Sequence, residues 1–199
     1  ADGSLPAGWS VICADPAEQY NPHVAHNAHD NQYLIAWEDM RHEAFDGRDI
    51  YGQLTDEYGS LVGSDIGIAT LADDQGPPRV AYNPDINQYL VVWADGRDQA
   101  STGYDVYGAR IRGDGILSDQ GMFAISRAAG DQRLPAAAYS GTTNQYLVAW
   151  DDSRSSQSDI YGQRLYGLGF PAGAEFGISA AEESHEAPDV AFNTVDHEY

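Results

Sequence analysis

The sequence predicts an all-β fold, namely a β-propeller built of four-stranded antiparallel blades of about 55 residues each. Three observations support this prediction. The tetrapeptide Asn-Gln-Tyr-Leu begins at residues 31, 87 and 144, and several other motifs recur at the same spacing. Each period contains four short runs that are typical of strands and are separated by turn residues. No segment has a convincing helical periodicity.

The four predicted strands follow one another in the same order in every period. The first is an apolar run after a proline, at residues 24–25, 80–82, 136–139 and 190–192. The second runs from Tyr to Trp at 33–37, 89–93 and 146–150, and its nearly continuous apolar character predicts burial on both faces. The third begins with Asp-Ile/Val-Tyr-Gly at 49, 105 and 159, and the fourth spans 66–69, 123–125 and 176–178. The dipeptide Asp114-Gly115 is a strong turn signal between a third and a fourth strand.

The repeats divide the chain into consecutive blades. Residues 22–77, 78–134 and 135–187 are predicted to be complete blades, 1–21 to end a preceding blade with a strand over Trp9 to Ala14, and 188–199 to start a further blade. A blade has two apolar faces and needs neighbours. We therefore expect further blades of the same protein, or a like chain, to complete the terminal blade. An open β-solenoid is the alternative architecture, although its coils are normally shorter than this period.

Charge and composition exclude several classes of partner. The chain has 10 Lys and Arg against 31 Asp and Glu, a net charge of −21. Nucleic acids and anionic membrane surfaces require a basic face, so neither is expected as a partner. No apolar run approaches about 18 residues, so no membrane insertion is expected. The single cysteine, Cys13, is predicted to be a buried structural thiol in the first strand.

Polar residues also recur with the repeat. Each strand-ending Trp (Trp37, Trp93 and Trp150) is followed by an Asp two residues on and an Arg four residues on. These are Asp39 and Arg41, Asp95 and Arg97, and Asp152 and Arg154, while a further Asp opens each third strand at Asp49, Asp105 and Asp159. The carboxylates suit a repeated Ca²⁺ site, and calcium is the only cofactor that the sequence suggests. The other interpretation is an Arg clamped between two carboxylates. Because a structural device recurs in every unit and a ligand site normally does not, the clamp is preferred.

Aromatic and histidine residues offer further candidates. The three strand Trp residues are predicted to pack between blades rather than to stack on sugars. Aromatic residues outside the repeat pattern are weaker ligand candidates: Trp9, Tyr20, Phe45, Tyr104 and Phe170. The histidines His23, His26, His29 and His42 are expected to be exposed turn residues, with a transition-metal site as the alternative.

The repeated motifs resemble the propeller-like repeats of large secreted or surface bacterial proteins. The match is strongest at residues 79–83, with Arg-Val-Ala-Tyr-Asn, at 88–97, and at 159–164, with Asp-Ile-Tyr-Gly-Gln-Arg. This resemblance implies an extracellular or cell-surface location. It does not imply an activity, because fold and function are separate properties.

Three functions follow from these observations as hypotheses. The preferred one is a non-enzymatic extracellular scaffold or binding module for a protein or carbohydrate ligand, which presents variable loops at 42–48, 98–104 and 155–158. The second is a carbohydrate-active enzyme, a hydrolase or a lyase, which would gather one non-repeated cluster of acid, base and aromatic groups on one face. The third is a structural unit of an extracellular polymer completed by strand exchange between chains. No catalytic residue is assigned.

Overall fold

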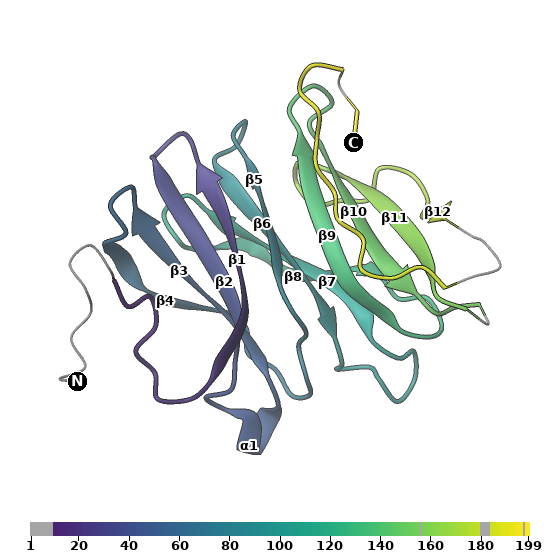
Figure 1. The fold of residues 1–199 in the computed structure, drawn as a ribbon, viewed down its shortest axis with the longest axis horizontal. Helices are drawn as coiled ribbons and strands as arrows, with labels where there is room; N and C mark the ends of the chain where they lie inside the picture. Colours follow the sequence, from purple (N-terminus) through teal and green to yellow (C-terminus); the bar gives the residue numbers. More distant parts are fainter. Residues whose placement is uncertain (1–9, 156, 180–183, 197) are drawn as a thin grey trace.

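The computed structural model describes residues 10–155, 157–179, 184–196 and 198–199 (Figure 1). These residues form three four-stranded antiparallel sheets, which confirms the all-β prediction. The first sheet contains β1 (Gln19–Asn27), β2 (Gln32–Asp39), β3 (Asp49–Asp56) and β4 (Leu61–Ala69). The second contains β5 (Arg79–Asn83), β6 (Gln88–Asp95), β7 (Asp105–Arg112) and β8 (Leu117–Ser126). The third contains β9 (Gln132–Ser140), β10 (Gln145–Asp152), β11 (Asp159–Tyr166) and β12 (Phe176–Ser179).

Each repeat forms its own sheet. Neighbouring strands in a sheet are consecutive in the chain, and no strand of one sheet pairs with a strand of another within the described residues. An open solenoid would instead add one strand of each coil to a shared sheet, so the structure does not support that alternative. A single four-residue helix in the described part, α1 (Glu43–Asp46), lies in the loop between β2 and β3, and one turn is too short to produce a periodic signal.

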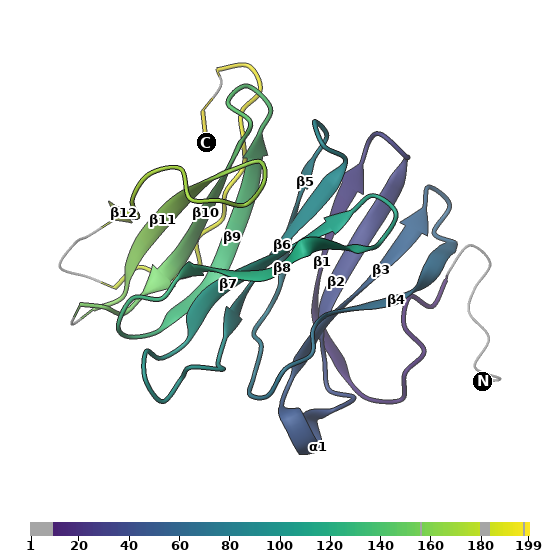
Figure 2. The same ribbon diagram turned by 180° about the vertical axis from the view of Figure 1, so that it is seen from behind.

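The sheets are arranged like the blades of a fan (Figures 1 and 2). The first strands of the sheets are neighbours, with β5 beside both β1 and β9, while the fourth strands β4 and β12 lie at opposite outer sides of the view. We call β1, β5 and β9 the inner strands. They run side by side along the line where the three sheets converge.

The core lies between the sheets. One cluster joins Leu34, Ile50 and Ile68 of the first sheet to residues of the second, including Trp93. A second cluster joins Leu90 and Val106 of the second sheet to residues of the third, including Trp150. Both faces of the middle sheet are therefore buried, as the apolar character of its second strand predicted. Trp93 and Trp150 are 0% exposed, which confirms their packing between blades.

Two of the three inner strands begin earlier than the predicted boundaries. β1 begins at Gln19 and β9 at Gln132, before the boundaries at residues 22 and 135. The strand register shifts between Tyr20 and His23, and again opposite Ala149 and Asp151 of β10. A bulge of this kind lets a strand continue past a proline, which lacks the N–H needed for regular pairing.

The two ends differ from the prediction. The expected strand over residues 9–14 is absent from the described residues 10–14, and Trp9 lies outside the described residues. Residues 190–192 are not a strand either, and the only pairing described near them is an isolated bridge between Asn193 and Glu198. A strand requires a hydrogen-bonded partner, and neither segment has one among the described strands. No helix in the described part of the chain has the length and hydropathy to cross a membrane.

Candidate functional site

A polar hollow lies where the inner strands begin. Its volume is about 430 Å³, and its wall includes Asn21, His23, Arg79, Leu134, Ala187 and Asp189. These residues come from the three inner strands and from the segment 184–190 that follows the third sheet. We call this site the strand-entry hollow. Residues from successive repeats meet in it.

The backbone at the rim of this hollow is strained. Asn21, Leu134 and Ala187 all have left-handed φ values, of 49°, 47° and 56°, and each precedes a proline. Residues with side chains rarely adopt this conformation, which costs on the order of 1–3 kcal/mol each. Strain of this kind concentrates at functional sites, where the surrounding structure holds it in place.

His23 is a neutral imidazole in the hollow, with one accepting and one donating nitrogen. Its Nδ1 accepts a hydrogen bond of 3.1 Å from the backbone N–H of Val80, which links β1 to β5. Burial, assisted by the positive charge of Arg79, lowers the pKa of His23. The imidazole is therefore neutral at neutral pH, and with Nδ1 accepting, the proton is on Nε2.

Arg79 and Asp189 supply opposite charges to the same wall. Arg79 donates from Nη1 to its neighbouring backbone oxygen, that of Pro78, at 3.0 Å. Asp189 accepts from the backbone N–H of Val190 at 2.9 Å and opposes the effect of Arg79 on the pKa of His23. The hollow thus offers a guanidinium donor, an imidazole donor and a carboxylate acceptor.

Two buried carboxylates are hydrogen-bonded to residues of the hollow's wall. Oδ1 of Asp151 on β10 accepts from the N–H of Ala187 at 2.6 Å, and burial raises the pKa of Asp151 to about 6. Glu38 on β2, which is 0% exposed, accepts from the Asn21 amide and pairs with Arg48 at 3.3 Å. The repeat places these two acids at equivalent positions, where the middle sheet has Ala94. The available sequence signal was an acidic residue directly after the strand-ending Trp in two of the three repeats, and the sequence analysis did not use it.

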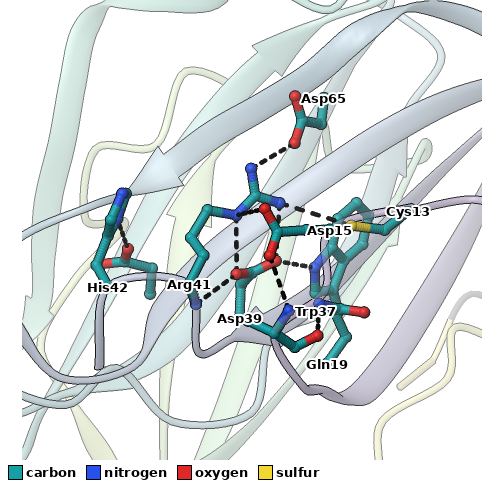
Figure 3. Close-up of polar contacts among 10 residues, drawn as sticks. Cys13, Asp15, Gln19, Trp37, Asp39, Arg41, His42 and Asp65 are labelled. Atoms are coloured by element: carbon teal, nitrogen blue, oxygen red, sulfur yellow. Dashed lines mark hydrogen bonds and ion pairs between the residues drawn. The ribbon is translucent and has the colours of Figure 1, made fainter. Parts of the chain in front are cut away.

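The predicted Asp–Arg pairs lie outside this hollow. Figure 3 shows the first, in which Asp39 accepts from the Trp37 indole at 2.9 Å and from the Arg41 guanidinium at 2.8 Å through both Nε and Nη2. The Arg41 guanidinium also stacks on the Tyr51 ring at 3.8 Å. Asp95 with Arg97 and Asp152 with Arg154 repeat the arrangement, each Arg stacking on the Tyr of the third strand. Asp39, Asp95 and Asp152 are each 0% exposed.

The second carboxylate of each predicted clamp lies elsewhere. Asp49, Asp105 and Asp159 are the register partners of Asp39, Asp95 and Asp152. Their side chains point to the loop before the third strand. Oδ2 of Asp49 lies 2.7 Å from Nδ1 of His42, and Oδ2 of Asp159 accepts a hydrogen bond of 2.9 Å from the Ser155 hydroxyl. Oδ2 of Asp105 accepts a hydrogen bond of 3.1 Å from the Thr102 hydroxyl, and burial raises the pKa of Asp105. The Arg instead reaches an acid near the fourth strand in two blades, Asp65 for Arg41 and Glu175 for Arg154.

No group of three or more His, Cys, Asp or Glu side chains suited to a metal ion occurs among the described residues. Calcium at the six aspartates stays a prediction. The histidine expectation is wrong for His23 and His26, which lie on β1 rather than in turns. Cys13 is half-buried and lies outside any strand, 3.6 Å from Nη2 of Arg41.

The other aromatic candidates are dispersed. Tyr104 is buried under the Arg133 guanidinium, at 3.8 Å, whereas Tyr20 and Phe170 are exposed away from the strand-entry hollow's wall. The side chain of Phe45 lies outside the described residues. The variable loops, in contrast, lie at the same end of the sheets as the hollow, because β2 ends at Asp39 beside Gln19, where β1 begins.

Solved structures share this arrangement of sheets. An α-L-arabinofuranosidase of Fusarium graminearum, solved with arabinobiose, matches 91% of this chain and 51% of its own, with a TM-score of 0.61 and 16% identity. The chain has a β-propeller-like fold. A Penicillium chrysogenum α-L-arabinanase, also with arabinobiose, matches the same shares at a TM-score of 0.62 and 18% identity. An N-acetylgalactosamine deacetylase of F. plautii, solved with a blood group B trisaccharide, matches 84% of this chain and 56% of its own at a TM-score of 0.57 and 11% identity.

These similarities correct the preferred functional hypothesis. The solved structures named above are of carbohydrate-active enzymes, so the expectation of a non-enzymatic scaffold or binding module is not supported. The β-propeller-like chain spans about half the length of the proteins it matches. No protein-family model and no curated protein sequence matches it.

Proposed function

We propose that this chain is part of a carbohydrate-active enzyme that hydrolyses glycosidic bonds, with arabinose-containing glycans as the substrate class. The observation that carries the proposal is the match of 91% of the chain to two arabinose-processing enzymes solved with arabinobiose. The non-repeated cluster of charged groups in the strand-entry hollow supports it, because an enzyme needs one such cluster on one face.

The hollow suits a sugar chemically. Arg79 and the Nε2 of His23 can donate to sugar hydroxyls, and Asp189 can accept from them. Glycoside hydrolysis requires two carboxyl groups, one protonated and one ionised. We assign the ionised role, activation of water or attack on the sugar, to Asp189. We assign the proton donor to Asp151, whose pKa of about 6 keeps part of it protonated near neutral pH.

Substitution of Asp189 tests this proposal. The native polypeptide is incubated with 4-nitrophenyl α-L-arabinofuranoside and with linear arabinan, and release of nitrophenol and of reducing ends is measured. We expect turnover by the chain and a loss of at least about 100-fold in Asp189→Asn. The matched control, Asp114→Asn, changes an exposed carboxylate in a distant turn and should keep full activity. Absence of turnover on both substrates, or full activity in Asp189→Asn, would contradict the proposal.

We also propose that the array of blades continues beyond the third sheet. Ile68 and Ile125 occupy equivalent positions and are 2% and 6% exposed under the next sheet, whereas Ile178 is 49% exposed. An apolar face that is covered in two blades and open in the third indicates a missing neighbour. A further four-stranded sheet of the same repeat is the occupant that fits this face.

The mass of the native polypeptide, measured together with its size in solution, tests this continuation. A mass well above 21.6 kDa is the expected result. A mass of 21.6 kDa with a larger size in solution would contradict it and assign the cover to a like chain. Repeating the size measurement with calcium and with a chelator tests the calcium prediction at the same time.

A further inference from the structure

We propose that a second sugar-binding site lies at the opposite end of the inner strands, in a hollow whose wall includes four aromatic rings. Its volume is about 460 Å³, and its wall includes His26, Tyr82, Pro84, Tyr139, Thr142 and Phe192. We call it the strand-exit hollow. The choice of a sugar as its ligand rests on the proposed function, but the site shares no lining residue with the strand-entry hollow.

The four rings belong to one repeated position. His26, Tyr82, Tyr139 and Phe192 follow each other at the spacing of the repeat, and the first three lie on β1, β5 and β9. Because the inner strands run side by side, the repeat brings one ring from each period to the same end of the fold. A ring that would be isolated in one blade thus becomes part of a shared aromatic wall.

Each ring is held in place by a second ring. Its centroid lies 4.8 Å from Tyr33 for His26, 5.1 Å from Tyr89 for Tyr82, and 5.0 Å from Tyr146 for Tyr139. Tyr89 and Tyr146 are 0% exposed, whereas Tyr82 and Tyr139 are half-buried and reach the hollow. The buried ring therefore fixes the orientation of the ring that faces solvent. A wall fixed before binding loses little conformational entropy when a ligand arrives.

Polar atoms lie next to the aromatic wall. The Tyr139 hydroxyl is 2.7 Å from Oδ2 of Asp85 and 2.9 Å from Oδ1 of Asn144. The Tyr82 hydroxyl donates to Oδ1 of Asn87 at 2.9 Å. Aromatic faces beside hydrogen-bond acceptors suit a sugar, whose C–H face packs on a ring while its hydroxyls donate. The net charge of −21 disfavours an acidic sugar, so the ligand class is a neutral glycan.

Titration with arabinobiose tests this second site. The Asp189→Asn background removes turnover, and the aromatic ring resonances are followed by NMR while arabinobiose is added. We expect the resonances of Tyr82 and Phe192 to shift in a saturable way. Tyr82→Ala should weaken this binding by about tenfold, whereas Tyr82→Phe, which keeps the ring, should retain most of it. Phe192→Ala removes a ring outside every described strand and repeats the test with little risk to folding.

Tyr58→Ala removes a tyrosine that is 82% exposed on a turn, and it should leave binding unchanged. The proposal is overturned if neither resonance shifts, or if the two alanine variants bind like the parent chain. A failed proposed function would look different: the parent chain would show no turnover, while arabinobiose would still shift the Tyr82 and Phe192 resonances.

Discussion

At the scale of single residues, the repeated Asp is a hydrogen-bonding hub inside the sheet. Asp95 accepts from the Trp93 indole at 2.8 Å, from the Arg97 backbone at 3.0 Å and from Arg97 Nε at 2.7 Å. A buried carboxylate is tolerated only when its oxygens are paired in this way. The arrangement ties the end of the second strand to the loop that follows, and the Arg97 guanidinium reaches the Tyr107 ring on the third strand.

The Asp95→Ala variant distinguishes this structural role from a metal role. Removing the carboxylate leaves the Trp93 N–H and the Arg97 guanidinium without their partner, so we expect a loss of about 3 kcal/mol in the free energy of unfolding. Urea denaturation measures this loss, and calorimetric titration with calcium should show the same affinity before and after the change. A loss of calcium affinity with little change in the stability of the metal-free chain would reverse the assignment.

Asp151 makes stability depend on pH. Its pKa in the folded chain, about 6, lies above the ordinary value of 3.8, so folding disfavours the ionised form. As pH rises, the unfolded chain releases this proton before the folded chain does. Asp151 therefore lowers the free energy of unfolding as pH rises from about 4, and the loss is complete above about pH 6.

The Asp151→Asn variant should remove that cost. We expect it to be more stable than the parent by about 1–3 kcal/mol at about pH 8, with the difference shrinking towards about pH 4. Thermal unfolding at several pH values measures the effect. A difference that does not change with pH would show that Asp151 keeps an ordinary pKa. Activity on 4-nitrophenyl α-L-arabinofuranoside, measured in the same samples, should fall if Asp151 is the proton donor.

At the scale of the elements, the inner strands decide where the sites lie. Bulges at Asn21 and near Leu134 let β1 and β9 continue past a proline, and both residues reach the rim of the strand-entry hollow. The same strands carry His26 and Tyr139 to the other hollow. One set of three strands therefore places a polar hollow at one end and an aromatic hollow at the other.

At the loops before the third strands, a glycine allows close approach to the segment that leads into the next sheet. Gly103 has φ of 93°, and a Cβ there would lie 2.8 Å from the backbone of Gly130. We expect Gly103→Ala to cost about 3 kcal/mol in unfolding free energy, because left-handed strain and a backbone clash add. Gly121 has φ of 65° with nothing near its missing Cβ, so Gly121→Ala should cost only about 1 kcal/mol. Equal losses in urea denaturation would show that the close approach contributes nothing.

At the scale of the whole molecule, stability comes from sheet faces that bury one another. The middle sheet has a neighbour on each side, and the third sheet has a described neighbouring sheet on only one. Equivalent residues therefore differ in burial according to their position in the array. Truncating equivalent residues on a covered sheet and on an uncovered sheet therefore measures the effect of a neighbouring blade.

The pair Ile125→Ala and Ile178→Ala uses that control. Ile125 is 6% exposed, so its truncation should lower the free energy of unfolding by about 3 kcal/mol. Ile178 is 49% exposed, so its truncation should lower that free energy by less than about 1 kcal/mol in the 199-residue chain. Urea denaturation at low protein concentration measures both. Equal losses would mean that another molecule already covers the third sheet in solution.

The sequence by itself determined the repeating unit, the all-β class, the strand order within each unit and the burial of the second strands. These features depend on local alternation, turn residues and motif spacing, which are all written along the chain. The pairing of Arg97 with Asp95 was also accessible, because the two residues are separated by only two positions.

Only the tertiary structure decided where the candidate sites lie. His23, Arg79 and Asp189 are separated by more than 50 residues from one another, and they meet because β1 lies beside β5 and the segment after the third sheet lies against both. The raised pKa of Asp151 depends on burial beside Ala187, a residue 36 positions further along the chain. The repeat shows which positions are equivalent, but packing between sheets decides which of them face one another. That packing is the sum of many weak contacts, and no local motif encodes it.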